Sequence, residues 1–391
     1  MRIILVTGKG GVGKTTVAAA TALTAADTGK RVLVMSTDPA HSLGDAFDLP
    51  LGDSLTEITP SLWGQQIDAQ RRLEMFWGEI RNQLMAVFDW GGVSGIEAEE
   101  FLVFPGMDEL FALLDVTQHA NSGEFDLLVV DCAPTAETFR LLSLPEVMSW
   151  YFDRVFNTER RVMRAARPVL TRMTNLPIPG DDVYGAVEGI FEGIEAAKKL
   201  LANTQITTAR LVVNPEKMVV EEARRTYTYL GLFGYGVDSV VVNRVLPDQV
   251  SDVYFTRWRQ IQAEHLESIR ANFAEVPVLA LRLFDEEMIG IDRLRALGLE
   301  LYDGRHPSDD FHGTTPFEVK EAGDEVIVQM RLPFVRGEEV DVFRHGSELY
   351  ITVGSYRRSF VLPDSLKRRS VLGAVLADGY LEISFTSEVP S

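Results

Sequence analysis

Two kinds of hydrophobic pattern divide the chain. Up to about residue 302, short continuous apolar runs alternate with longer amphipathic stretches, which is typical of parallel strands covered by helices. The runs are RIILVT from Arg2, RVLVMSTD from Arg31, LLVVD from Leu127, ARLVVN from Ala209, SVVVN from Ser239 and VPVLAL from Val276. We therefore predict an α/β domain over residues 1–302, built on a mostly parallel open sheet.

The pattern changes after a polar segment. Residues 303–315 (DGRHPSDDFHGTT) show no periodicity and are expected to form a linker. Beyond them, apolar and polar residues alternate in segments such as EVIVQMRL, ELYITV and YLEISF, with glycine-containing turns between them. Residues 316–391 are therefore expected to form a small all-β sandwich.

Two stretches of the first domain, about 60–110 and 140–200, are too long and too apolar on one side to be simple connections. We predict helical insertions there. In the first, apolar residues at helical spacing include Phe76, Trp77, Leu84 and Phe88. In the second, aromatic residues and methionines such as Met163 are mixed with arginines. From the spacing alone, the ordinary interpretation is that these stripes pack on their own domain.

Composition narrows the class of protein. The chain has 391 residues, of which 46% are hydrophobic and 24% charged, as in soluble globular proteins. Its net charge of −19 makes nucleic acid a poor partner, because phosphate backbones are repelled. The single cysteine, Cys132, cannot form an intrachain disulfide, a four-thiolate zinc site or a three-thiolate metalloid site. With no long apolar segment, we expect a cytoplasmic protein that does not span a membrane.

The strongest chemical signal lies between the first strand and the first helix. The residues Gly8, Gly13, Lys14 and Thr15 fit the phosphate-loop pattern G-x-x-x-x-G-K-[ST]. Its backbone N–H groups surround a β-phosphate, its lysine reaches the β- and γ-oxygens, and its hydroxyl ligates Mg²⁺. The alternative is a glycine-rich turn with a solvated lysine. We expect nucleotide binding by Gly8, Lys9, Gly10, Gly11, Val12, Gly13, Lys14, Thr15 and Thr16.

Two aspartates follow apolar strands and should face these phosphates, because ligands gather at the carboxyl ends of parallel strands. Asp131 ends LLVVD and fits the role of holding Mg²⁺ directly or through water. Asp38 then remains to orient or deprotonate the attacking water, and to contribute to the metal site. The alternative for each aspartate is a cap of the following turn.

Several strings together point to one family. They are GKGGVGKTT from Gly8, STDPAHSLGDAF from Ser36, PGMDE from Pro105, DCAPTAETFR from Asp131, VVNPEKM from Val212 and VVNRVLP from Val241. In this order they resemble the arsenite-pump ATPase family, which includes the ATPase that guides tail-anchored proteins to membranes. The resemblance covers residues 1–302. The last region resembles the α-crystallin-type domain of small heat shock proteins.

The resemblance implies further roles. The second loop lysine, Lys9, marks a deviant phosphate loop whose ATPases work as face-to-face homodimers, with this lysine crossing to the partner's nucleotide. Asp38 would be the water-activating switch residue and Asp131 would open the second switch. Glu216 and Asn243 would contact the nucleotide, with Asn243 at the adenine.

Departures from the family's usual residues matter as well. Ala136 and Glu137 stand where glycine and histidine are common, and Arg282 stands where a proline often lines the adenine pocket. The cysteine pair that bridges many relatives through zinc is missing near SDVYFTRWRQ, so no zinc clamp is expected. With Cys132 alone and one phosphate loop, arsenite transport is disfavoured, and the cysteine count excludes the bridging iron–sulfur cluster of nitrogenase reductase.

These observations lead to a functional hypothesis with ATP and Mg²⁺ as cofactors. The protein is expected to be a homodimeric ATP hydrolase whose cycle gates an apolar groove for a hydrophobic client, such as a membrane-protein helix, with a transient membrane receptor as a further partner. Phe76, Trp77, Leu84, Phe88 and Met163 are the groove candidates. The alternative from another class is a holdase or scaffold that binds ATP with negligible turnover.

Overall fold

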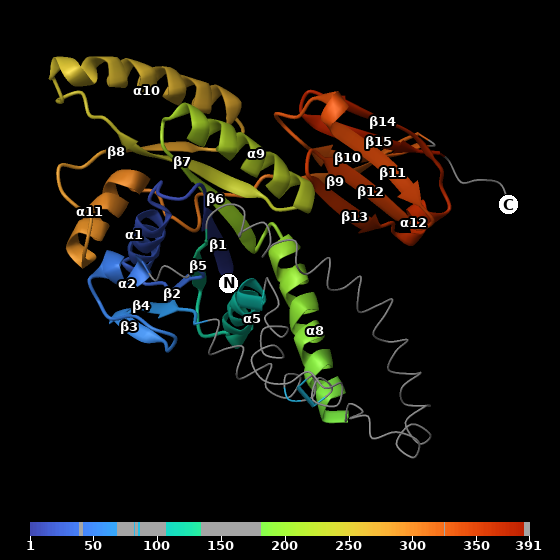
Figure 1. Cartoon of the computed structure of the whole chain (residues 1–391), viewed down its shortest axis with the longest axis horizontal. Coiled ribbons are helices and arrows are strands. Elements are labelled where there is room, and N and C mark those ends of the chain that lie inside the picture. Colours follow the sequence, from blue (N-terminus) through green and yellow to red (C-terminus); the bar gives the residue numbers. More distant parts are fainter. Residues whose placement is uncertain are drawn as a thin grey trace.

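The computed structural model describes residues 1–38, 42–68, 82, 85–86, 107–133, 181–323 and 325–386. Within these ranges the chain forms a large sheet with helices and, next to it, a pair of small antiparallel sheets (Figure 1). The predicted fold class, an α/β domain followed by an all-β sandwich, is confirmed. Among the described helices, none has the length and apolar character needed to cross a lipid bilayer.

The large sheet of the described chain has eight strands in the order β3-β4-β2-β5-β1-β6-β7-β8. Every neighbouring pair is parallel except β3 and β4 at one edge. The strands are β1 (Arg2–Thr7), β2 (Val32–Ser36), β3 (Thr56–Thr59), β4 (Leu62–Gln66), β5 (Leu127–Asp131), β6 (Thr207–Val213), β7 (Val237–Val245) and β8 (Val278–Arg282). All six expected strands are present, and β3 and β4 are additions.

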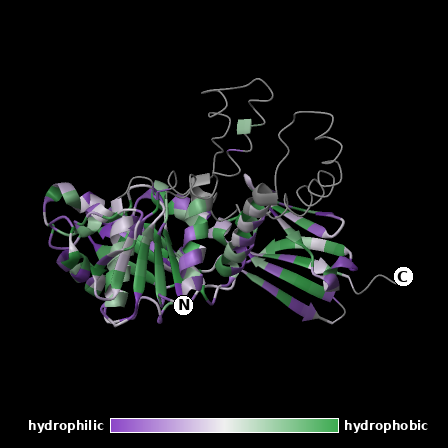
Figure 2. Ribbon diagram, turned by 90° about the horizontal axis from the view of Figure 1, so that it is seen from below, coloured by the Kyte–Doolittle hydropathy of each residue, from purple (hydrophilic) through white to green (hydrophobic). Residues whose placement is uncertain are grey.

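Helices cover the faces of this sheet (Figure 1). They are α1 (Lys14–Ala26), α2 (Ser42–Phe47), α5 (Met107–Ser122), α8 (Asp181–Ala202), α9 (Lys217–Phe233), α10 (Val253–Asn272) and α11 (Ile291–Tyr302). The helix α1 packs on β1, β2 and β5 and against α11, while α5 packs against α8. Because both faces are covered, the central strands β2, β5 and β6 are buried along their whole length. Figure 2 shows the strands of the large sheet as mainly apolar ribbons.

The helical insertions lie largely outside the described residues. The groove candidates Phe76, Trp77, Leu84, Phe88 and Met163 all lie outside them, as do Ala136 and Glu137. At the described margins, β4 occupies part of the range 60–110, since it pairs with β2, so a helical insertion does not begin at residue 60. The helix α8 occupies the end of the range 140–200.

The polar segment 303–315 packs against the sheet at the end opposite the phosphate loop. Phe311 is 1% exposed, and its carbonyl oxygen accepts a hydrogen bond from the Arg2 guanidinium. The Arg210 guanidinium lies 4.9 Å from the Phe311 ring centroid and forms an ion pair with Asp238 at 3.0 Å. Burial alone would raise the pKa of Asp238, but Arg210 and then Arg2 hold it below its usual range. This segment is therefore fixed to the α/β domain.

The sandwich consists of a four-stranded sheet, β14-β15-β10-β9, and a three-stranded sheet, β11-β12-β13. Along β15 buried positions alternate with half-buried ones, as the period of two requires. The elements are β9 (Phe317–Ala322), β10 (Glu325–Arg331), η2 (Gly337–Glu339), β11 (Val340–His345), β12 (Glu348–Val353), β13 (Tyr356–Val361), α12 (Asp364–Lys367), β14 (Val371–Ala377) and β15 (Tyr380–Phe385). The predicted turns contain Gly323, Gly346 and Gly379, each with a positive φ.

The sandwich is seated on the second half of α9. Leu232 of α9 is fully buried and belongs to the sandwich core. Tyr229 and Tyr356 pack with ring centroids 4.2 Å apart, and Arg358 Nη1 donates to the Leu232 carbonyl oxygen at 2.5 Å. At Gly231 the two parts approach so closely that an added Cβ would lie 2.4 Å from the Arg331 carbonyl oxygen. The core of the sandwich is therefore completed by a residue of the α/β domain.

Candidate functional site

The phosphate loop has a backbone that depends on its glycines. Gly8, Gly11 and Gly13 have φ values of 151°, 80° and 94°, a region that residues with a Cβ rarely adopt. At Gly8 a Cβ would also lie 2.2 Å from the Val212 carbonyl oxygen of β6. At Gly13 it would lie 2.4 Å from Nδ2 of Asn243. The loop is therefore held against the ends of two neighbouring strands.

The first residues of α1 carry the loop's functional side chains. Lys14 is the first residue of the helix and is 6% exposed, so its ammonium group is largely withdrawn from water. The Thr15 hydroxyl lies 3.0 Å from the Ser42 hydroxyl at the start of α2. Two hydroxyl groups therefore lie together beside the loop, although the sequence motif contains only one of them.

Asp131 lies at the end of β5 and is fully buried. Burial raises the pKa of its carboxyl group to about 7, although the Thr15 hydroxyl and the Lys14 ammonium oppose the shift. The Ser36 hydroxyl lies 3.4 Å from Oδ2, and Oδ1 has no hydrogen-bond partner among the described residues. A buried carboxylate oxygen without a partner costs free energy unless a cation or a water is bound to it.

These oxygen donors fit magnesium. Mg²⁺ is commonly bound through one or two protein oxygens together with waters and phosphate oxygens, rather than in an all-protein cage. Thr15 and Asp131 supply such oxygens, and the described residues contain no group of three or more His, Cys, Asp or Glu side chains arranged to hold a metal. Thr15 and Asp131 would hold the ion, with the expected third residue, Asp38, close to Asp131.

Asp38 lies two residues beyond β2, which ends at Ser36 rather than at the expected Asp38. Its backbone N–H donates to the Ser36 hydroxyl at 3.2 Å, and its carboxylate is close enough to Asp131 to raise the pKa of that group. Asp38 is half-buried. The structure thus brings Lys14, Thr15, Asp38 and Asp131 together.

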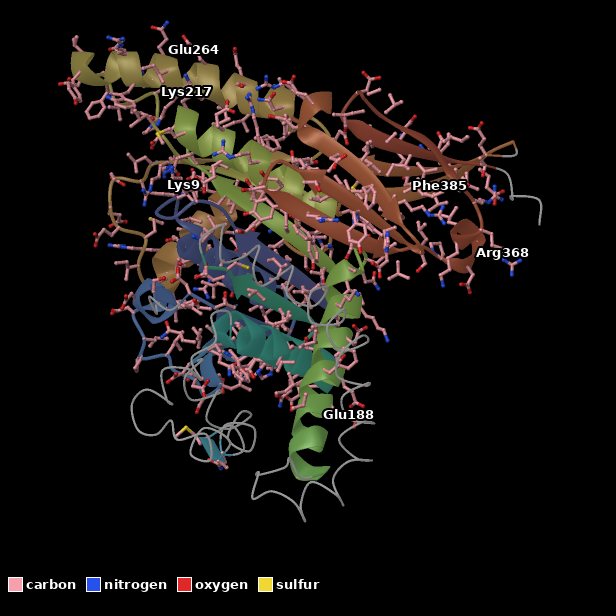
Figure 3. The ribbon with its side chains drawn as sticks, turned by 45° about the vertical axis from the view of Figure 1, so that its right-hand side comes forward. Lys9, Glu188, Lys217, Glu264, Arg368 and Phe385 are labelled. Atoms are coloured by element: carbon pink, nitrogen blue, oxygen red, sulfur yellow. The ribbon has the colours of Figure 1, made fainter. Side chains whose placement is uncertain are left out.

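Lys9 points to a neighbouring helix of its own chain. Its Nζ lies 3.5 Å from Glu222 Oε2 of α9, and both side chains are partly exposed. Figure 3 places Lys9 and Lys217, the first residue of α9, at the same end of the molecule. A partly exposed ion pair of this kind contributes at most about 1 kcal/mol to stability. Lys9 can therefore leave Glu222 for another anion.

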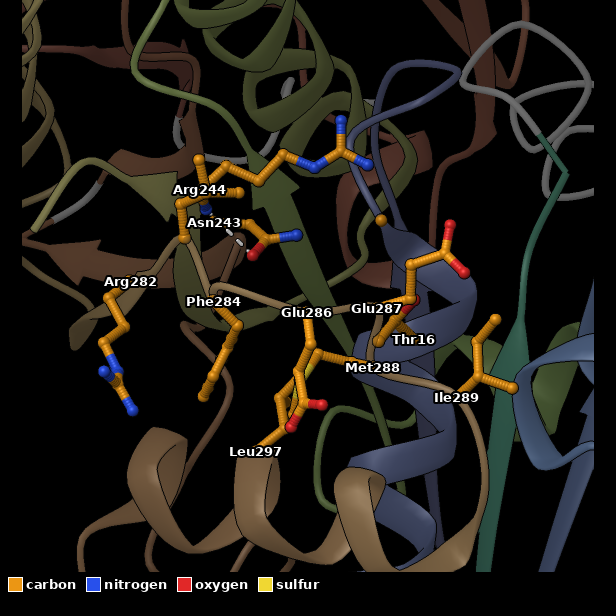
Figure 4. A pocket seen from close by; sticks show the side chains of 12 residues that line it. Thr16, Asn243, Arg244, Arg282, Phe284, Glu286, Glu287, Met288, Ile289 and Leu297 are labelled. Carbon is orange, nitrogen blue, oxygen red and sulfur yellow. Dashed lines mark hydrogen bonds between the residues drawn. The ribbon is translucent and has the colours of Figure 1, made fainter. Parts of the chain in front are cut away.

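A cavity of about 490 Å³ opens beside the loop (Figure 4). It extends from Gly13 and Thr16 to an apolar end formed by Leu283, Phe284 and Met288. Asn243 lines this cavity, and its Nδ2 donates to the Val12 carbonyl oxygen at 2.8 Å. The size and lining are suitable for a nucleoside.

Arg282, the residue that departs from the family's usual proline, lines the same cavity. Its Nε donates to Glu300 Oε2 of α11 at 2.9 Å, and its guanidinium lies 4.8 Å from the Phe284 ring centroid. The arginine is therefore held by two partners outside the loop.

Glu216 lies apart from this cavity. It is the exposed N-cap residue of α9, with an extended backbone, and does not line the cavity. Near it, Asn214, which directly follows β6, is 7% exposed, and its Oδ1 has no hydrogen-bond partner among the described residues. Sequence reasoning missed Asn214, Ser42 and Arg244, although Arg244 follows Asn243 directly and could have been considered with it.

The model of the family described as "Anion-transporting ATPase" matches residues 1–303. The chain belongs to this family. A second model, "HSP20-like domain found in ArsA", matches residues 323–385 and therefore falls on the sandwich. The resemblance inferred from the sequence is confirmed for both regions, and the chain is an ATPase.

Some relatives align with nearly the whole chain and others with part of it. A protein of Aquifex aeolicus named as an arsenical pump-driving ATPase is 37% identical, over 94% of this chain and 95% of its own length. A protein of Prosthecochloris vibrioformis with the same type of name is 38% identical, over 99% of this chain and 96% of its own. A Trypanosoma cruzi protein named as an ATPase ASNA1 homolog is 29% identical, over 79% of this chain and 94% of its own.

Proposed function

We propose that this ATPase is magnesium-dependent, acts as a homodimer and uses its nucleotide cycle to gate an apolar groove for a hydrophobic client such as a membrane-protein helix. The observation that carries the catalytic part is the convergence of Lys14, Thr15, Asp38 and Asp131 at the start of α1. The client part rests on the family and on the apolar stripes of the sequence.

The residues divide the chemistry among them. The loop N–H groups and Lys14 bind the β- and γ-phosphates, and Thr15 with Asp131 holds the metal, which when bound neutralises charge on the phosphate oxygens. Asp38 orients the attacking water and accepts its proton, because its carboxylate lies near the phosphate end of the site and remains partly exposed. Lys9 of one subunit leaves Glu222 and contacts the nucleotide of the other subunit.

The catalytic proposal is tested with Asp38→Asn. ATP binding should be retained, because the phosphate loop is unchanged, while steady-state phosphate release should fall by about 10² or more, because the water loses its base. Binding is measured by calorimetry and turnover by phosphate release with and without Mg²⁺.

The matched control is Asp48→Asn. Asp48 is exposed, lies beyond α2 and has a positive φ of 54°, which asparagine also adopts readily. It should turn over ATP at the wild-type rate. If Asp38→Asn hydrolyses ATP as fast as this control, Asp38 is not the base. If the wild type binds ATP without turnover, the holdase alternative holds.

The client proposal uses the same Asp38→Asn protein. With ATP and Mg²⁺ bound and hydrolysis blocked, it should retain an apolar helical peptide longer than the ADP-bound protein does, as measured by fluorescence anisotropy. Equal retention in both nucleotide states would contradict nucleotide gating of a groove.

The names of two relatives raise arsenical transport as a second candidate. A soft metalloid is held by several thiolates, and Cys132 is the only cysteine of the chain. Its thiol is fully buried, and burial raises its pKa, so the reactive thiolate is disfavoured. We therefore place the hydrophobic client before an arsenical substrate.

A further inference from the structure

The cavity beside the phosphate loop is lined by two arginines with different surroundings. Arg282 is held by Glu300 and by the Phe284 ring. Arg244 is an exposed residue, and its guanidinium has no hydrogen bond or ion pair with any part of the chain that the structure describes. An arginine that lines a cavity without a partner is available to a ligand.

The backbone at Arg244 is also unusual. Its φ of 58° is in the left-handed region, which is uncommon for a residue other than Gly, Asn or Asp. The pairing of β7 with β8 is interrupted between Val242 and Val245, so Arg244 lies in an irregularity of the strand. Bulges of this kind redirect a side chain and are frequent next to active sites.

The surrounding structure fixes this conformation. The Arg244 N–H donates to Asn243 Oδ1 at 2.9 Å, and Gln262 of α10 donates to the Arg244 carbonyl oxygen at 3.3 Å. Gln262 Oε1 also accepts from the Leu246 N–H at 2.8 Å. A strained backbone persists where its neighbours determine it, and such positions are concentrated at functional sites.

The position of Arg244 indicates which part of a nucleotide it faces. The cavity joins the loop residues Gly13 and Thr16 to the apolar end at Phe284, and Figure 4 shows Arg244 extending from the end of β7 toward the start of α1. If the loop holds the β- and γ-phosphates and the apolar end holds the base, the α-phosphate lies between them.

We propose that Arg244 is a nucleotide-binding residue that contacts the α-phosphate of the nucleotide bound to its own subunit. This inference rests on the proposed nucleotide site. Because ATP and ADP share the α-phosphate, the contact strengthens binding of both to the same extent. The guanidinium provides a charge-assisted hydrogen bond to a phosphate oxygen.

The test measures the Kd of ATP and ADP by calorimetry for the wild type and for Arg244→Ala. Both Kd values should rise by the same factor, about ten- to a hundredfold, as expected for the loss of a hydrogen bond between charged groups. Arg257→Ala is the matched control, because it removes the same charge from an exposed position of the neighbouring α10. It should leave both Kd values unchanged.

Arg244→Gly separates binding from backbone strain. Glycine accepts a φ of 58° without strain, so this variant should melt at the wild-type temperature or above while losing as much affinity as Arg244→Ala. If Arg244 is a binding residue on a strained backbone, replacing it with glycine lowers the affinity for nucleotide without lowering the melting temperature. A lower melting temperature with unchanged affinity would indicate a structural residue and overturn the inference.

The remaining outcomes are also decisive. Unchanged Kd values in a folded Arg244→Ala protein overturn this inference alone, while the proposed function stands. A loss confined to ATP places the contact at the γ-phosphate and contradicts the α-phosphate assignment. If the wild type itself binds neither nucleotide, the proposed function fails as well.

Discussion

Asp131 shows how one buried residue connects stability with function. Its carboxyl group is fully buried, and its pKa of about 7 lies well above that of an exposed aspartate. Desolvation is the largest cause, so the charged form that a metal requires is disfavoured in the protein without ligands. Ligand binding and stability are therefore linked at this residue.

The sign of this linkage gives a prediction. Between pH 5 and pH 8 the unfolded chain has ionised Asp131, whereas the folded protein keeps the proton up to about pH 7. This group should therefore lower the free energy of unfolding by about 3 kcal/mol across that range, since each pKa unit corresponds to about 1.4 kcal/mol. Asp131→Asn should abolish this decline in urea unfolding measured without nucleotide and with EDTA.

Asp126→Asn is the control, since this residue directly precedes the same strand. The Arg31 hydrogen bonds hold the pKa of Asp126 at about 2, so its contribution to stability is lost only below about pH 4. The variant should keep the wild-type decline between pH 5 and pH 8. An undiminished decline in Asp131→Asn would show that another group causes it.

Residues with local signals were predictable from the sequence, whereas residues placed by distant parts of the chain were not. Gly8, Lys14 and Thr15 form one motif, and Asp131 follows directly from its strand. Ser42 reaches Thr15 only because α2 folds beside α1. The availability of Arg244 depends on a strand irregularity and on Gln262 of another helix, which no local pattern reveals.

At the scale of elements, α9 connects the two domains. Near its start, Glu222 forms an ion pair with Lys9 of the phosphate loop. Near its end, Leu232 enters the sandwich core and Tyr229 packs on Tyr356. One helix therefore contacts both the nucleotide loop and the sandwich.

A substitution at the closest point of this contact has a predictable effect. Gly231→Ala would place a methyl group 2.4 Å from the Arg331 carbonyl oxygen, so the sandwich must shift from α9. We expect the free energy of unfolding to fall by about 1–3 kcal/mol, as for other overpacked sites. Chemical denaturation measures the loss.

Gly189→Ala in α8 provides the opposite control, because a Cβ there meets nothing within 4 Å. Alanine in an open helical position normally stabilises by about 0.5–1 kcal/mol. If Gly231→Ala were as stabilising as Gly189→Ala, the contact between α9 and the sandwich would not be tight in solution.

Prediction of elements succeeded where the pattern was strong. The continuous apolar runs of the large sheet and the alternating runs of β10, β12 and β15 were recognisable. The strands β3, β4 and β14 were not: β3 has only four residues, β4 (LWGQQ) ends in two polar residues, and β14 (VLGAVLA) shows no alternation of polar and apolar residues. At the edges, β3 and β14 have one unpaired side and receive weaker constraints on their side chains.

At the scale of the whole molecule, the proposed homodimer depends on Lys9. The chain holds Lys9 through an exchangeable pair with Glu222, and the proposed dimer requires Lys9 to act on the partner's nucleotide. By analogy with arginine fingers, Lys9→Ala should lower hydrolysis by about 10³ or more.

A mixed dimer tests this arrangement. Lys9→Ala and Lys14→Ala homodimers should both be inactive, whereas a dimer with one subunit of each kind should recover up to half of the wild-type turnover. In that dimer both defects fall in one site and the other site is complete. Phosphate release is measured on a mixture of differently tagged subunits after tandem purification. If the mixed dimer has no activity, Lys9 does not act across the interface.

The strand order of the large sheet also constrains how the protein is synthesised. β1 leaves the ribosome before β5 and β6, yet it pairs with β5 on one side and with β6 on the other. Translation must proceed from β1 to the end of β6 at Val213 before both edges of β1 are covered. Until then the nascent chain exposes an apolar strand edge, which favours aggregation. Because Gly8 packs on Val212, the growing chain also cannot complete its phosphate loop, so nucleotide can assist folding only late in translation.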